Sequence, residues 1–148
     1  MKTLRLPGLI ALPGNRNTMF LEIPTPNGHY SQAVIYEGLI YLSGQLPNDK
    51  ETALSIEEQA IQVLTNTRNI LTAARTSMDR VLKTTVYIAD IGLWNRVDRI
   101  FGEFFGEHRP ARTIVPTGPL HFGFQIEMDA IASLDAQKAI PQHIKEVV

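Results

Sequence analysis

Hydrophobic residues recur at helical spacing in two segments of the chain. The first begins at a capping-box pattern, with Ser55 as the N-cap and Glu58 reaching back to it, and its apolar positions continue to about Arg75. The second runs from about residue 93 to residue 105. Its predicted buried stripe consists of Trp94, Val97, Phe101 and Phe104. The pattern therefore predicts two amphipathic helices.

Other segments alternate apolar and polar residues or concentrate β-branched ones, which is typical of strands. Residues 32–36 and 39–43 predict a β-hairpin around Glu37-Gly38, and this dipeptide leaves the turn type open. Further strands are predicted at residues 81–88, 112–115 and 125–134. The predicted order of elements is ββαβαββ, an α+β arrangement in one sheet.

Two helices can cover only one face of such a sheet. The apolar residues of the last strand point to one side and are expected beneath the helices; they are Ile126, Met128, Ala130 and Ala132. Gln125, Glu127 and Asp129 point to the other side. We expect a second copy of the chain to cover this half-polar face, because Tyr41, Tyr87 and other apolar groups must also be accommodated.

The chain has 148 residues and is most simply one domain, placed here at residues 19–134. Residues 1–18 are rich in Pro, Gly and Asn and predict an irregular N-terminal arm. Residues 135–148 form a polar tail that contains Pro141, and we expect this tail to be loosely ordered.

Charge and composition exclude several classes of function. The formal net charge is −1, with acids and bases interspersed, so the basic surface of a nucleic-acid-binding protein is not expected. The chain has no cysteine, which excludes disulfides, thiolate catalysis and sulfur-ligated metals. No apolar run is long enough to span a membrane, and the N-terminus lacks a signal-peptide pattern. We therefore expect a cytoplasmic protein without membrane or nucleic-acid partners.

The common motifs for phosphate loops, dinucleotide folds, zinc proteases and serine hydrolases are all missing from the sequence. The histidines are scattered without metal-ligand spacing, and no metal site is predicted. They are His29, His108, His121 and His143.

Arg112 and Glu127 are the strongest candidates for chemistry. They lie on two successive predicted strands, so a fixed cation and a fixed carboxylate are expected at neighbouring positions of the sheet. Spacing alone favours an ordinary salt bridge. In the alternative, Arg112 grips a ligand carboxylate with its planar fork, and Glu127 orients or deprotonates a water. The two interpretations are compatible, because the pair could partly satisfy each other in an empty site. Register decides whether Arg112 and Ile114, or Thr113 and Val115, share the face of Glu127.

Two further residues have a structural and a functional interpretation. Tyr30 either packs at the start of a strand or forms the wall of a pocket. Ser43 has no obvious base partner, so it fits a hydrogen-bonding residue at a strand end better than a nucleophile.

Five short motifs in order resemble the RidA family, also called YjgF. They are residues 28–34 (Gly-His-Tyr-Ser-Gln-Ala-Val), 42–47 (Leu-Ser-Gly-Gln-Leu-Pro), 83–90 (Lys-Thr-Thr-Val-Tyr-Ile-Ala-Asp), 110–113 (Pro-Ala-Arg-Thr) and 126–132 (Ile-Glu-Met-Asp-Ala-Ile-Ala). The resemblance extends over roughly residues 24 to 134.

This resemblance implies a chorismate-mutase-like fold and a homotrimer with a central barrel, in which the active sites lie in clefts between subunits. It also implies hydrolysis of 2-imino acids, such as 2-iminobutanoate and 2-iminopropanoate, to 2-keto acids and ammonia without a cofactor. The expected ligand is therefore a small imino or keto acid.

By position, the resemblance assigns a role to each candidate residue. Arg112 matches the arginine that clamps the substrate carboxylate, and Glu127 matches the acid that positions the water. Tyr30 matches the pocket tyrosine, and Ser43 and Gly44 match the segment that lines the site. The chemistry is consistent with these roles, because an imine carbon is already electrophilic and mainly needs orientation and a proton relay.

The chain departs from the family pattern in four respects, one of which is an N-terminal arm longer than usual. Ile114 stands where a cysteine is often found, Asp98 stands where an asparagine is often found, and residues 117–124 replace the usual turn. Asp98 and Ile114 are therefore candidate substrate-binding residues that bear on specificity. Two alternatives stay open: a deaminase of an aminoacrylate-like or aminomuconate-like enamine, and a non-catalytic, ligand-sensing or regulatory trimer. A ribonuclease role is disfavoured by the charge balance.

Overall fold

The computed structural model describes residues 1–4, 9–12, 19–50 and 53–134 of the chain. Its strands are β1 (Lys2–Leu4), β2 (Leu9–Leu12), β3 (Met19–Glu22), β4 (Ala33–Tyr36), β5 (Leu39–Gln45), β6 (Val81–Ile88), β7 (Ala111–Pro116) and β8 (Ile126–Ser133). The helices are α1 (Ile56–Ala73) and α2 (Trp94–Phe105), with short 3-10 helices η1 (Met78–Arg80), η2 (Ile91–Leu93) and η3 (His121–Gly123). From β4 to β8 the order is the predicted ββαβαββ, and the α+β class is confirmed.

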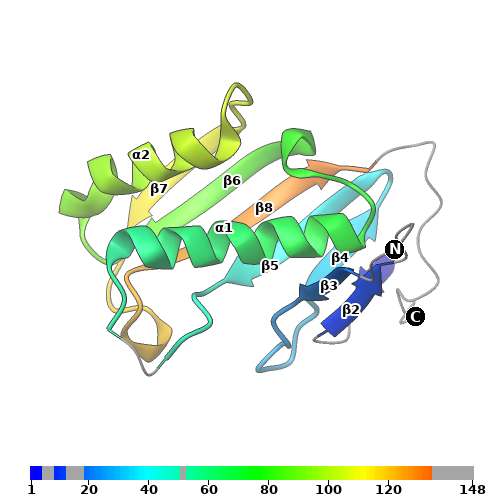
Figure 1. The fold of residues 1–148 in the computed structure, drawn as a ribbon, viewed down its shortest axis with the longest axis horizontal. Coiled ribbons are helices and arrows are strands. Elements are labelled where there is room, and N and C mark those ends of the chain that lie inside the picture. The colour runs from blue at the N-terminus through cyan, green and yellow to red at the C-terminus, as the bar shows by residue number, and fades with distance from the viewer. Residues whose placement is uncertain (5–8, 13–18, 51–52, 135–148) are drawn as a thin grey trace.

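Six strands form one sheet in the order β1-β4-β5-β8-β6-β7. All neighbours are antiparallel except β6 and β7, which are parallel and are joined through α2, as a parallel pair requires. Strands β2 and β3 form a separate antiparallel pair. Both α1 and α2 lie across the same face of the large sheet (Figure 1), so neither of these helices covers the opposite face.

The β4–β5 hairpin turns at the predicted dipeptide. Both central residues have positive φ, 47° at Glu37 and 76° at Gly38. Positive φ at both positions belongs to the type I′ turn, whose twist matches that of paired strands. Glu37 adopts a left-handed conformation that is usually adopted by Asn, Asp or Gly. The sequence signal for this turn type is therefore weak.

Helix α1 begins at the predicted capping box. The Ser55 hydroxyl accepts a hydrogen bond from the Glu58 backbone N–H at 3.2 Å, and the Ser55 N–H donates to the Glu58 carboxylate at 2.8 Å. These bonds satisfy two backbone donors that a helix start otherwise leaves unpaired. The start of α1 is confirmed, and the helix ends within two residues of the predicted end.

The core lies between the helices and the sheet. The predicted inward-facing residues of β8 are all buried, with at most 2% exposure; they are Ile126, Met128, Ala130 and Ala132. Around them the buried side chains form two clusters, one beneath the second half of α1 and one shared by α1, α2, β6 and β8. The alternation predicted for β8 is therefore confirmed.

The predicted stripe of α2 is wrong at its first position. Trp94 is 38% exposed, whereas Val97, Ile100 and Phe101 are buried. Trp94 is the first residue of α2, and its ring faces the Arg112 guanidinium instead of the core.

The N-terminal arm is not wholly irregular. Strand β1 pairs antiparallel with β4, and β2 pairs with β3. Pairing with β1 satisfies backbone groups along what would otherwise be an open edge of the sheet. The Pro, Gly and Asn content of the arm predicted irregular structure, but strands of three and four residues form within it. The predicted tail at residues 135–148 lies outside the described residues.

Candidate active site

A β-bulge changes the direction of the backbone of β5 where this strand pairs with β8. Leu42 is paired with Ala130 and Gln45 with Met128. Between these two pairs β5 advances by three residues and β8 by two. The extra residue falls in the Ser43-Gly44 step. Bulges bend a strand and often occur beside active sites, because they redirect side chains and backbone groups.

The Glu127 carboxylate lies directly against the backbone of Gly44. A Cβ at position 44 would be 3.1 Å from Glu127 Cδ and would overlap Glu127 Oε1. Only glycine leaves room for the carboxylate in this position. The bulge and the missing side chain thus hold one acid in a defined place.

The surroundings of Glu127 favour its protonated form. The side chain is half-buried, and this burial raises the pKa of the carboxyl above its ordinary value of 4.5. The nearby negative charge of Asp129 raises the pKa further, and His121 acts in the opposite direction. A carboxyl whose pKa is raised toward neutral pH is better suited to accept and return a proton than an ordinary surface acid.

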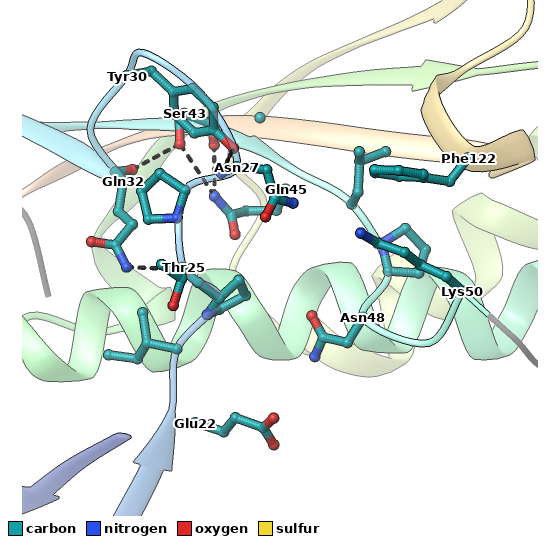
Figure 2. A pocket seen from close by; sticks show the side chains of 16 residues that line it. Glu22, Thr25, Asn27, Tyr30, Gln32, Ser43, Gln45, Asn48, Lys50 and Phe122 are labelled. Carbon is teal, nitrogen blue, oxygen red and sulfur yellow. Dashed lines mark hydrogen bonds between the residues drawn. The ribbon is translucent and has the colours of Figure 1, made fainter. Parts of the chain in front are cut away.

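A cavity of about 370 Å³ opens beside the bulge (Figure 2). Tyr30, Ser43 and Gly44 all line it. The Ser43 hydroxyl donates to the Gln32 carbonyl at 3.1 Å, and the Tyr30 hydroxyl accepts from the Asn27 N–H at 3.1 Å. In Figure 2, Tyr30 and Ser43 are drawn toward one end of the cavity, and Phe122 and Lys50 toward the other. We refer to Tyr30, Ser43, Gly44 and Glu127 as the Glu127 group.

Residues 117–124 contribute to the other end of this cavity. Phe122 lines it with a φ of 60°, a left-handed conformation that is unusual for an aromatic residue. The ammonium of Lys50 lies 3.7 Å from the centre of the Phe122 ring, and the ring of His121 stacks on it at 3.9 Å. Because both groups cannot occupy one side of the ring at those distances, Phe122 lies between them. The departure seen in the sequence therefore reaches the cavity wall.

Arg112 lies on a different part of the sheet. Strand β6 separates β7 from β8, so Arg112 and Glu127 are not on neighbouring strands. Arg112 is paired with Thr84, which is buried beneath the helices, while Glu127 is paired with Tyr87 on the other face. The expected contact between Arg112 and Glu127 is therefore wrong within one chain.

The partner of Arg112 is Asp98. Arg112 Nη2 donates to Asp98 Oδ1 at 2.7 Å, and the guanidinium lies 5.5 Å from the ring centres of both Trp94 and Phe101. A cavity of about 660 Å³ adjoins this pair. Ile114, two residues along β7, packs against the buried cluster under α2. We refer to Asp98, Arg112 and Ile114 as the Arg112 group.

Comparison with known proteins places this geometry in a family. The family model described as Endoribonuclease L-PSP matches residues 20–134. The chain belongs to this family, which is also the RidA or YjgF family. The predicted resemblance is confirmed.

Individual relatives agree with this assignment. Protein HMF1 of Saccharomyces cerevisiae is 37% identical over 113 residues, covering 74% of this chain and 88% of that protein. The human 2-iminobutanoate/2-iminopropanoate deaminase is 38% identical over 115 residues, covering 75% and 84%. The crystal structure of Escherichia coli TdcF with bound serine has a TM-score of 0.71 at 29% identity, covering 76% of this chain and 94% of that one.

Within the RidA family fold, the structure divides the predicted site residues into the two groups just described. Sequence reasoning missed Gln32, Lys50 and Phe122 as cavity residues and Trp94 as a neighbour of Arg112. The unusual composition of residues 117–124 was the one signal that pointed to Phe122.

In the stretches 1–4, 9–12, 19–50 and 53–134, no three His, Asp or Glu side chains gather closely enough to hold a metal ion. In the same part of the chain, neither helix combines the length and the apolar character needed to cross a membrane.

Proposed function

We propose that this protein hydrolyses 2-imino acids of the 2-iminobutanoate and 2-iminopropanoate type to 2-keto acids and ammonia. The observation that carries the proposal is the Glu127 carboxyl, held over Gly44 beside a polar cavity with its pKa raised. The cavity volume of about 370 Å³ is in the range of small-molecule sites. The human relative named as a deaminase of these imines supports the same substrate class.

The complete site requires two copies of the chain. Arg112 and Glu127 lie on opposite faces of one sheet with β6 between them, so one chain cannot place both on one small ligand. A second copy packed on the helix-free face would bring its Arg112 group to the first copy's Glu127 group. We propose a homotrimer, in which a closed ring gives three equivalent seams of this kind.

Each residue then has a defined task. Arg112 binds the substrate carboxylate, as a planar guanidinium does through charge-assisted hydrogen bonds. Glu127 takes a proton from a water whose oxygen bonds to the imine carbon, while the C=N π electrons move to the nitrogen. The protonated Glu127 gives this proton to the nitrogen, which becomes an amino group. Glu127 then takes the hydroxyl proton and passes it to the same nitrogen, the C–N bond breaks, and ammonia leaves as the C=O bond forms. Ser43 and Tyr30 line the neighbouring cavity, and Glu127 reaches its wall through the contact with Gly44.

Subunit complementation tests both the chemistry and the seam. At imine concentrations well below KM, Arg112→Ala is expected to keep about a tenth or less of the parent rate of imine hydrolysis, and Glu127→Gln about a thousandth. The rates are measured by coupling the protein to a threonine dehydratase and following imine decay. Co-refolding equal amounts of the two variants should restore about a quarter of the parent activity, because one seam in four then combines an intact Arg112 with an intact Glu127.

Two results would contradict the proposal in different ways. Hydrolysis by the single variants at the parent rate would remove the assigned roles of Arg112 and Glu127. Loss in both variants without recovery in the mixture would place both residues of a site in one chain and so reject the seam. Co-refolding either variant with itself is the control for the refolding step.

A further inference from the structure

In the proposed function, the Arg112 guanidinium binds the substrate carboxylate. One donor of this guanidinium already forms a hydrogen bond with Asp98. Only its Oδ1 contacts Arg112, at Nη2, so the remaining donors of the guanidinium stay available to a ligand. The side chains of Arg112 and Asp98 are 22% and 46% exposed, respectively, and they lie beside the larger cavity. A ligand carboxylate on Arg112 would therefore bind next to a second negative charge.

Helix α2 fixes this arrangement. Trp94, Asp98 and Phe101 follow one another at helical spacing of four and three residues, so they share one face of α2. The two rings lie 5.5 Å from the guanidinium, where their faces attract a cation. Three side chains of α2 therefore lie around the Arg112 guanidinium, and a carboxylate on its remaining donors would bind near Asp98.

The substrate and the product differ in the charge of the group next to their carboxylate. A protonated imino acid carries a cationic nitrogen next to its carboxylate, whereas the keto acid carries only the carboxylate. A negative charge a few ångströms away attracts the first group and repels the second.

We propose that Asp98 is a specificity-determining residue that favours ligands with a positively charged nitrogen beside the carboxylate and weakens binding of the keto acid product. This inference rests on the proposed role of Arg112 as the carboxylate clamp. Asp98 would thus help the site to distinguish substrate from product, and it would speed product release.

A matched pair of ligands tests this inference. 2-Oxobutanoate is the product form, and 2-aminobutanoate has the same carbon skeleton with an ammonium group in place of the short-lived iminium. Both are titrated into the parent protein and into Asp98→Asn, which keeps the shape of the side chain and removes its charge. We expect about tenfold tighter binding of 2-oxobutanoate and about tenfold weaker binding of 2-aminobutanoate in the variant.

Two control variants separate the possible failures. Glu103→Gln removes another acid of α2, one that pairs with Arg99, and should leave both affinities unchanged. Arg112→Ala should weaken both ligands. Equal shifts of both ligands in Asp98→Asn, or no shift, would overturn the role of Asp98 alone. Unchanged binding in Arg112→Ala would instead overturn the carboxylate clamp, and with it the proposed function.

Discussion

The two charged groups of the candidate site lie in contrasting environments. Glu127 is half-buried, makes no salt bridge within the described part of the chain, and has a raised pKa. Arg112 has an ionic partner in Asp98 and two aromatic neighbours that hold its guanidinium. A carboxyl in the first environment exchanges protons readily, and a cation in the second keeps its charge and position. The contrast indicates that the fold separates proton transfer from ligand binding.

The largest expected effects are a loss of kcat in one variant and a rise of KM in another. Glu127→Gln should lower kcat about a thousandfold, the usual contribution of a general acid–base group, with a small change in KM. Arg112→Ala should raise KM about tenfold to a hundredfold, because a charge-assisted hydrogen bond to the substrate is lost. Steady-state kinetics of imine decay measures both values.

The kinetics of Glu127→Gln and Arg112→Ala can contradict the separation of proton transfer from ligand binding. If both variants lower kcat alone by similar factors, the two residues act together in the chemical step, and the separation of tasks is wrong. Circular dichroism and sedimentation of each variant serve as the control for folding and assembly.

A smaller effect is expected from Gly44→Ala. The added methyl group would displace the Glu127 carboxylate, and a shift of about 1 Å at a reacting group should lower kcat about tenfold to a hundredfold. Because the far end of Glu127 can rotate away, the free energy of unfolding should fall by less than about 1 kcal/mol.

Gly102→Ala is the matched comparison for stability. A Cβ at Gly102, inside α2, meets nothing within 4 Å, so alanine should raise the free energy of unfolding by about 0.5–1 kcal/mol. Urea unfolding measures the free energy of unfolding of Gly44→Ala and Gly102→Ala, and steady-state kinetics measures their kcat. A Gly44→Ala protein with parent kcat would show that Glu127 does not need its place against the bulge.

Local patterns predicted most of the fold. The capping box at Ser55, the alternation along β8 and the Glu37-Gly38 turn each depend on residues close in sequence, and each is confirmed. The position of β7 depends on the crossover through α2, which places β7 parallel to β6 and on the far side of β6 from β8. The sequence spacing between Arg112 and Glu127 does not indicate that β6 lies between their strands.

The candidate site was predicted residue by residue but not as an arrangement. Glu127 meets Gly44 where a bulge adds one residue to β5, and a bulge has no period that a sequence pattern can show. Trp94 was predicted to be buried because helical periodicity does not distinguish a core contact from a contact with a guanidinium. Local order was therefore accessible from the sequence, and long-range placement was not.

The smallest expected effect is on stability and depends on pH. Since the folded protein raises the pKa of Glu127 above its value of 4.5 in a free chain, the folded state holds this proton more strongly than the unfolded state. The resulting stabilisation is complete below that value and is lost as pH rises through the folded pKa. Glu127→Gln should therefore gain stability relative to the parent as pH rises from 4.5 through the folded pKa of Glu127, by less than about 1 kcal/mol because the carboxyl keeps part of its hydration. Urea unfolding at a fixed protein concentration measures this difference, and a parent protein that instead gains on the variant over the same range would show that burial does not dominate the environment of Glu127.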